Sequence, residues 1–163
     1  MNRCLMLAAS AAILLAAAPA FAADYAVLRV ETVVDAPISK AWAVVGGWCT
    51  IEKWRPDIGP CVSTSGDGGV GSIRHLAGAR NIVEVMVAQT RYSYTYTQPA
   101  STILYHGTLA AEPIDPGKTR LIYTLLYDQE PDGSQPAKDK DRAARTATWT
   151  SALVSMKTMI EGK

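Results

Sequence analysis

Alternation between apolar and polar side chains dominates the middle of this chain. From residue 58 to residue 128 the two kinds alternate with a period of two, and glycine- or proline-containing segments interrupt the pattern. Such alternation is typical of half-buried β-strands joined by tight turns. A similar stretch at residues 28–34 predicts one earlier strand. The six later strands are expected at residues 58–65, 70–76, 81–89, 91–97, 102–112 and 119–128.

Helical spacing occurs on either side of these six strands. Pro37 is suited to the first turn of a short helix, and Gly46 follows its last apolar position. One more helical turn is expected over residues 50–54. Pro136 opens a long C-terminal helix whose apolar residues recur three and four positions apart. These residues are Trp149, Ala152, Leu153, Met156, Met159 and Ile160.

The order of these elements predicts an α+β fold with two short helices between strands 1 and 2. Short turns between successive strands favour a curved antiparallel sheet of seven strands. The long C-terminal helix would then cover the concave face of that sheet. Because one helix cannot fill such a concavity, we expect an internal, mostly apolar cavity with few polar groups.

The first 22 residues have the pattern of a secretory signal peptide. Arg3 is followed by an apolar stretch over residues 4–18 and by a small-x-small cleavage site that ends at Ala22. Cleavage there would deliver residues 23–163, a single domain, to the periplasm or the medium. An uncleaved membrane anchor is the alternative, although the apolar stretch is short for one. No second run of spanning length follows, so no stable membrane insertion is expected after cleavage.

Composition excludes several kinds of function. The chain has 16 basic and 15 acidic side chains, with a net charge of +1 and no long block of either sign. Nucleic acid is therefore not an expected partner, because its binding normally needs a basic face. His75 and His106 lie at neither nucleophile nor metal spacing. We accordingly predict no catalytic residue, no metal and no cofactor.

Charged and aromatic residues interrupt the apolar strands. Arg74 and Glu84 are the two charged positions of most interest, because a buried guanidinium or carboxylate needs a partner or a polar ligand group. The alternative is a solvated pair on the outer face of the sheet. Tyr92, Tyr94 and Tyr96 share one face of a strand. They could form an aromatic wall with hydroxyl groups or simply pack across strands.

Several motifs, in this order and spacing, resemble the START-like or helix-grip superfamily. Within it, the chain is most similar to the polyketide cyclase/dehydrase and lipid-transport (SRPBCC) family, which also includes plant abscisic-acid receptors. The resemblance covers nearly all of residues 25–161 and implies a helix-grip fold. The motifs are V-x-A-P-x-x-x-A-W at 34–42, W-R-P-D-I-G-P-C at 54–61, G-S-I-R at 71–74, I-V-E at 82–84, R-Y-S-Y-T-Y at 91–96, and Tyr105.

The resemblance also implies a binding site. It places Arg74 and Glu84 toward the cavity, with tyrosines beside them and Trp54 at the mouth. The C-terminal helix is expected to be the lid, because its stripe is the only long apolar face available to oppose the sheet. The expected ligand-binding residues are Trp54, Arg74, Glu84, Tyr94, Tyr105, Tyr123, Trp149, Leu153 and Met156.

The chain departs from the plant receptors at two points. They carry a lysine that holds the ligand carboxylate just before the cysteine matching Cys61, where this chain has Gly59 and Pro60. Their gate loop is also longer than the turn at residues 76–81. We therefore expect neither a lysine that binds a ligand carboxylate nor a signalling gate in this chain.

Cys49 and Cys61 are the cysteines outside the signal peptide. Their separation allows a disulfide in an oxidising compartment, and two separate thiols are the other possibility. Intracellular relatives carry a lone cysteine at the position of Cys61. We therefore predict that the two are unpaired or only facultatively paired.

Our leading hypothesis is an exported binding or carrier protein for a hydrophobic small molecule or lipid, with no chemistry of its own. One alternative is a small cyclase- or dehydratase-type enzyme, which would use Arg74, Glu84 and a tyrosine in the same cavity. Another is an accessory protein that a periplasmic enzyme recognises through its surface.

Overall fold

The computed structural model describes residues 23–78 and 80–162. The predicted signal peptide lies outside these residues. Within them, the helices are α1 (Ile38–Val45), α2 (Ile51–Trp54) and α3 (Gln135–Glu161), with 3-10 turns η1 (Pro56–Ile58) and η2 (Glu130–Asp132). The strands are β1 (Tyr25–Val34), β2 (Cys61–Ser65), β3 (Ile73–Leu76), β4 (Ile82–Thr90), β5 (Ser93–Thr97), β6 (His106–Asp115) and β7 (Lys118–Asp128).

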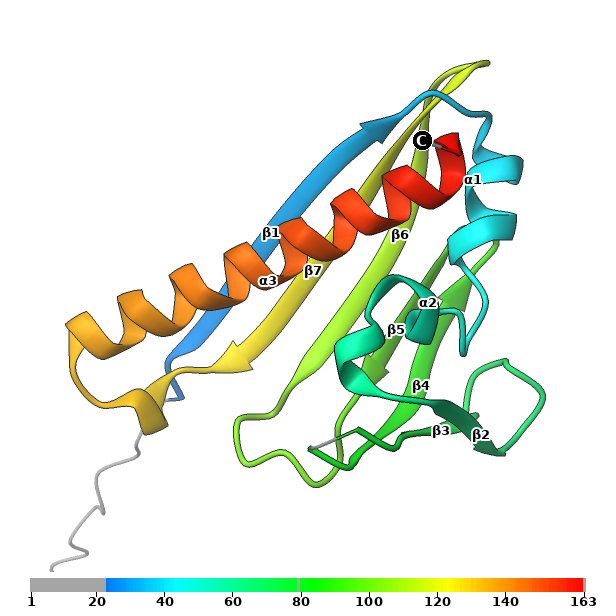
Figure 1. Ribbon diagram of the computed structural model, residues 1–163. Coiled ribbons are helices and arrows are strands. Elements are labelled where there is room, and N and C mark those ends of the chain that lie inside the picture. Colours follow the sequence, from blue (N-terminus) through cyan, green and yellow to red (C-terminus); the bar gives the residue numbers. More distant parts are fainter. Residues whose placement is uncertain (1–22, 79, 163) are drawn as a thin grey trace, which may run out of the picture.

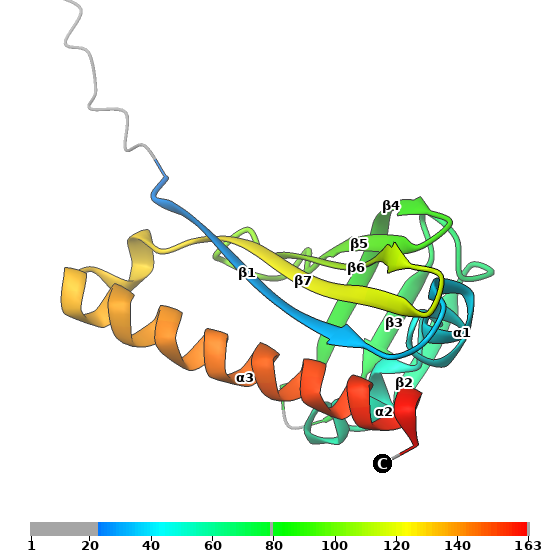
Figure 2. The ribbon, with the colours of Figure 1, turned by 90° about the horizontal axis from the view of Figure 1, so that it is seen from above.

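All seven strands belong to one antiparallel sheet in the order β1-β7-β6-β5-β4-β3-β2. Strands β2 to β7 follow one another as a meander, while β1 pairs with β7 along its whole length. Helix α3 lies on the same side of the bent sheet as α1 and α2 and runs along β1 and β7 (Figures 1 and 2). The predicted α+β helix-grip architecture is confirmed.

Helix α3 is anchored through its C-terminal half. Its buried residues are Trp149, Ala152, Leu153, Met156 and Ile160, which is the predicted apolar stripe without Met159. The stripe faces the sheet because burying apolar area is the main stabilising contribution available to an amphipathic helix. Residues 135–148 carry no buried side chain. None of the described helices is long and apolar enough to cross a membrane.

Some strand boundaries differ from the prediction because of local backbone geometry. The second strand was expected from residue 58, but η1 precedes it and Gly59 follows with a positive φ of 76°. A Cβ atom at Gly59 would lie 2.6 Å from the backbone nitrogen of Gly78, so only glycine permits this close approach. The sixth strand begins at His106 rather than residue 102, after Leu104 with a φ of 51°.

Candidate functional site

A cavity of about 310 Å³ lies between α3, the α2–η1 segment and strands β3 to β5. Its wall combines apolar side chains with charged, hydroxyl and amide groups. The apolar residues are Ile51, Ile58, Leu76, Ile82, Ile103, Ala144 and Trp149. The polar residues are Arg55, Arg80, Glu84, Tyr96, Gln98, Tyr105, Asp141, Arg145 and Thr148.

A buried ion pair adjoins this cavity. Arg74 and Glu84 are direct partners in the β3–β4 register. Arg74 Nη2 lies 2.5 Å from Glu84 Oε2, and the two side chains are 0% and 2% exposed. Arg74 Nη1 also donates to the carbonyl oxygen of Trp48. The pair is therefore inside the molecule, and the alternative of a solvated pair on the outer face is wrong.

Glu84 reaches the cavity, whereas Arg74 lies behind it. Gln98 Nε2 donates to the second carboxylate oxygen of Glu84 over 2.9 Å. The Arg74 guanidinium lies 3.9 Å from the centre of the Trp48 ring, an arrangement that favours a cation over the aromatic face. Burial by itself would lower the pKa of Arg74, but Tyr94 and Glu84 raise it above its usual value. Arg74 thus stays charged and keeps Glu84 compensated.

Buried tyrosines surround the ion pair. The hydroxyl groups of Tyr96 and Tyr123 lie 2.8 Å apart and share a hydrogen bond. Burial raises the pKa of Tyr105 to about 12. Burial likewise raises the pKa values of Tyr96 and Tyr123. These phenols are consequently neutral near pH 7 and can act as hydrogen-bond donors there.

Three arginines in the cavity wall were not predicted as site residues. Arg55 binds Asp57 through two hydrogen bonds of 2.7 Å, which hold the pKa of Asp57 below its usual range. Arg145 pairs with Asp141, one helical turn earlier, over 2.7 Å. Arg80 is exposed and has no ion-pair partner within residues 23–78 and 80–162.

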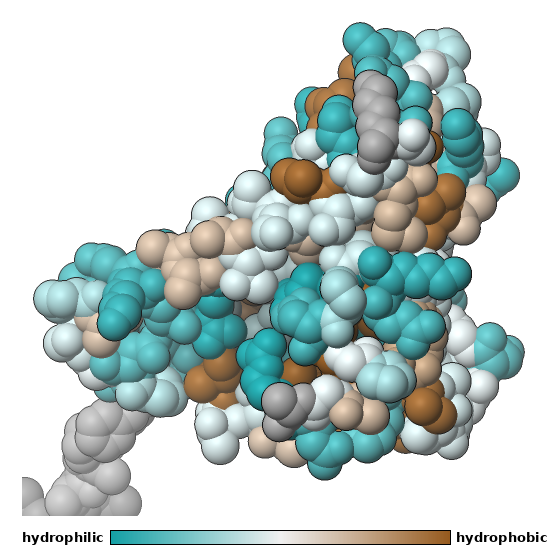
Figure 3. All heavy atoms as spheres, viewed as in Figure 1, coloured by the Kyte–Doolittle hydropathy of each residue, from teal (hydrophilic) through white to brown (hydrophobic). Residues whose placement is uncertain are grey.

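The sequence contained only weak signals for these arginines. Arg55 and Asp57 belong to the W-R-P-D motif, and the i,i+4 spacing of Asp141 and Arg145 is an ordinary sign of a helical ion pair. Nothing in the pattern singled out Arg80. On the face shown in Figure 3, hydrophilic side chains gather over the N-terminal half of α3 and the middle of the molecule, and apolar surface forms only separate small areas.

The comparison with known proteins agrees with this architecture. A family model described as polyketide cyclase/dehydrase and lipid transport matches residues 25–161. The chain belongs to this family. No curated protein sequence gives a significant match to it.

Solved structures share the fold of this polyketide cyclase/dehydrase and lipid-transport family member at low identity. A protein from Nitrosospira multiformis is 21% identical, with a TM-score of 0.65 over 82% of this chain and 94% of its own. The Zhui aromatase/cyclase of a Streptomyces species is 15% identical, with a TM-score of 0.66 over 84% and 94%. Ara h 8.0201 is 17% identical, with a TM-score of 0.63 over 85% and 99%. Likeness at these identities establishes the fold alone.

The structure of this family member separates the predicted site residues into two groups. Glu84, Tyr105 and Trp149 line the cavity. The other six are buried around the cavity without forming part of its wall. Trp54 was expected at the mouth but lies in the core, with its ring centre 6.3 Å from that of Tyr123. Tyr123 in turn stacks on Trp149 at 3.7 Å between ring centres. These six residues are Trp54, Arg74, Tyr94, Tyr123, Leu153 and Met156.

The prediction for the cysteines is wrong. Cys49 and Cys61 form a disulfide, with their Cα atoms 5.3 Å apart. The chain after α1 folds back onto the start of β2, and the Cys61 backbone nitrogen donates to Glu52 Oε2 over 2.9 Å. This return brings the two thiols together, which sequence separation alone did not show. The bond connects the segment that covers Arg74 to the first residue of β2.

The two histidines do not contribute to the cavity wall. His75 contacts the side chain of Asn81, and His106 Nδ1 lies 2.7 Å from the carbonyl oxygen of Leu104. Among the described residues, no three His, Cys, Asp or Glu side chains are grouped so that they could hold a metal ion.

Proposed function

We propose that this protein is exported and binds a small molecule with an apolar body in its internal cavity, without changing it chemically. The cavity itself is the observation that carries the proposal. Its volume of about 310 Å³ is near the lower end of the range of roughly 300–1,000 Å³ that is usual for small-ligand pockets. This size suits a compact ring system or short chain better than a full-length lipid.

The chemistry of the wall supports binding over catalysis. Both carboxylate oxygens of Glu84 already accept hydrogen bonds, from Arg74 and from Gln98. Glu84 would have to give up one of these hydrogen bonds before it could act on a ligand. Burial raises the pKa of Tyr105 to about 12, so its phenol does not supply a base near pH 7. These groups are suited to orient a ligand through hydrogen bonds.

Export is supported by two features. The sequence before Ala23 has the charge, apolar and cleavage pattern of a signal peptide, and removing it would leave β1, which begins at Tyr25, complete. The Cys49–Cys61 disulfide suits an oxidising compartment. N-terminal sequencing of the protein from a periplasmic extract should begin at Ala23. Recovery of the chain with residues 1–22 intact would count against export.

Binding can be tested with phenylnaphthylamine (NPN), a neutral apolar dye whose fluorescence rises in apolar surroundings. Ala144 and Ala147 are both exposed on α3, but only Ala144 belongs to the cavity wall. In Ala144→Trp the indole should obstruct the cavity and weaken NPN binding at least tenfold. Ala147→Trp, the matched control, should bind as the parent does.

Two results would contradict the proposal. One is the absence of NPN binding to the parent protein, and the other is equal binding by the two tryptophan variants. Native mass spectrometry of the purified protein provides an independent measurement, since a retained ligand would add a defined mass that Ala144→Trp should lose.

A further inference from the structure

We infer that the ligand carries an anionic group, such as a carboxylate, which is bound between Arg80 and Arg55 while its apolar body lies against the aliphatic and aromatic residues of the wall. This inference rests on the proposed function, because it names the class of molecule that the same cavity takes.

The balance of charge around the cavity supports an anion. Three arginines and two acidic residues line it. Glu84 is compensated from behind by Arg74, and Asp141 by Arg145. Arg55 is compensated by Asp57, which does not line this cavity. Arg80 alone has no carboxylate within ion-pair distance in the part of the chain that the structure describes. Asp57 is the nearest acidic influence on Arg80: the two line a small adjoining pocket, and the charge of Arg80 helps to lower the pKa of Asp57. Because Asp57 is already bound by Arg55, Arg80 remains the arginine of the cavity wall without an ion-pair partner of its own.

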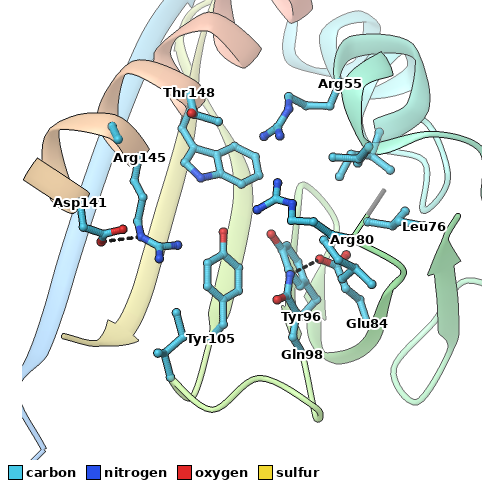
Figure 4. Close-up of a pocket in the computed structure, with 16 residues that line it drawn as sticks. Arg55, Leu76, Arg80, Glu84, Tyr96, Gln98, Tyr105, Asp141, Arg145 and Thr148 are labelled. Carbon is cyan, nitrogen blue, oxygen red and sulfur yellow. Dashed lines mark hydrogen bonds and ion pairs between the residues drawn. The ribbon is translucent and has the colours of Figure 1, made fainter. Parts of the chain in front are cut away.

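Several hydrogen-bond donors of the wall point toward the same part of the cavity. In Figure 4, the guanidinium groups of Arg55 and Arg80 and the hydroxyl groups of Tyr96 and Tyr105 point toward the same space. Arg55 uses Nε and Nη2 for Asp57, and among the described residues no hydrogen bond engages its Nη1. The Arg55 guanidinium is also held 4.9 Å from the centre of the Trp149 ring. A buried, fixed arginine beside a second one without an ion-pair partner is suited to a planar anion.

The rest of the wall limits the ligand to an amphipathic molecule. Ile51, Leu76, Ile82 and Ile103 contribute aliphatic surface, and Trp149 contributes a large ring. A fully hydrated inorganic anion would leave this surface without contacts, whereas an aromatic or aliphatic acid would cover it. Exposure of Arg80 places its charge where an entering ligand would meet it.

The test compares two dyes that differ by one anionic group. Anilinonaphthalenesulfonate (ANS) is NPN with an added sulfonate. The parent protein should bind ANS about tenfold more tightly than NPN, because charge-assisted hydrogen bonds are stronger than neutral ones. Arg80→Gln should remove most of that difference and leave NPN binding within about twofold of the parent value. Added salt should weaken the binding of ANS and not that of NPN.

Arg91→Gln is the control for net charge. Arg91 is exposed in the β4–β5 turn and does not line the cavity. This variant loses the same charge as Arg80→Gln, and it should keep the parent preference for ANS. Thermal melts of both variants should match the parent, since both arginines are exposed.

The results separate the inference from the proposed function. If NPN binds and Ala144→Trp obstructs it, but ANS shows no preference or Arg80→Gln changes both dyes equally, the anionic site is refuted while the proposed function stands. If Arg91→Gln lowers ANS binding as much as Arg80→Gln does, the preference for ANS comes from the net charge of the protein, and the anionic site is refuted. If neither dye binds the parent, the proposed function is refuted and the inference with it.

Discussion

Arg74 and Glu84 face each other across β3 and β4, with Arg74 Nη2 2.5 Å from Glu84 Oε2 and both side chains almost fully withdrawn from solvent. A buried pair of this kind is tolerated because each charge compensates the other. Its net contribution to stability over an apolar pair of the same shape is small or even negative. With Glu84 in the cavity wall and Arg74 behind it, the pair fits a role in orienting polar groups such as Gln98.

We predict that breaking this pair from one side is costly. Arg74→Met or Glu84→Leu alone should lower the free energy of unfolding by about 3 to 5 kcal/mol, because the remaining charge stays buried without a partner. Arg74→Met combined with Glu84→Leu should recover much of that loss. Urea unfolding of the four proteins measures this coupling. Additive losses in the double variant would show that the two charges do not compensate each other.

The Cys49–Cys61 disulfide should be complete in protein that folds under oxidising conditions. A chain of residues 23–163, purified without reductant and then denatured, should contain no free thiol. Reduction should lower the free energy of unfolding by about 3 kcal/mol, since the bond restricts a short loop in the unfolded chain. Cys49→Ser with Cys61→Ser should reproduce that loss. Detection of two free thiols per chain by a thiol reagent would contradict the bond.

Docking of α3 onto the sheet can be tested at two nearby positions. Met156 is 0% exposed, whereas Val154 on the same helix is 57% exposed. Met156→Arg should cost several kcal/mol, because it buries a charge without a partner. Val154→Arg should unfold at nearly the temperature of the parent. Equal melting temperatures for the two variants would mean that the buried stripe does not hold the helix.

Tyr105 should make stability sensitive to alkaline pH. Burial raises its pKa to about 12 in the folded protein, above the value of about 10 for an unfolded chain. The folded state therefore holds this proton more tightly. The resulting stability is complete below about pH 10 and is lost as the pH rises through 12.

Tyr105→Phe, which cannot ionise, provides the comparison. Denaturant unfolding between about pH 9 and pH 12 should show a smaller loss of stability in the variant than in the parent. Identical pH profiles would indicate that Tyr105 ionises as freely in the folded protein as in the unfolded one.

Local patterns determined the elements of this fold. The alternation along residues 58–128 predicted the strands, and the spacing of Trp149, Leu153 and Met156 predicted the face that α3 buries. These predictions succeeded because a side chain's direction in a helix or strand repeats with a fixed period. The order of the elements and the short turns between them indicated how they are arranged, and the resemblance to the family implied that Arg74 and Glu84 lie inside.

Only the tertiary structure decided which residues share the cavity. Arg55, Arg80 and Arg145 come from the end of α2, the β3–β4 turn and α3, and no periodic pattern relates three such segments. The disulfide likewise depended on the path of the chain between α1 and β2. Periodicity specifies which face of one element is buried, whereas the packing of distant segments specifies what that face meets. Residues in turns carry no period, so their contribution to the site could be seen only after folding.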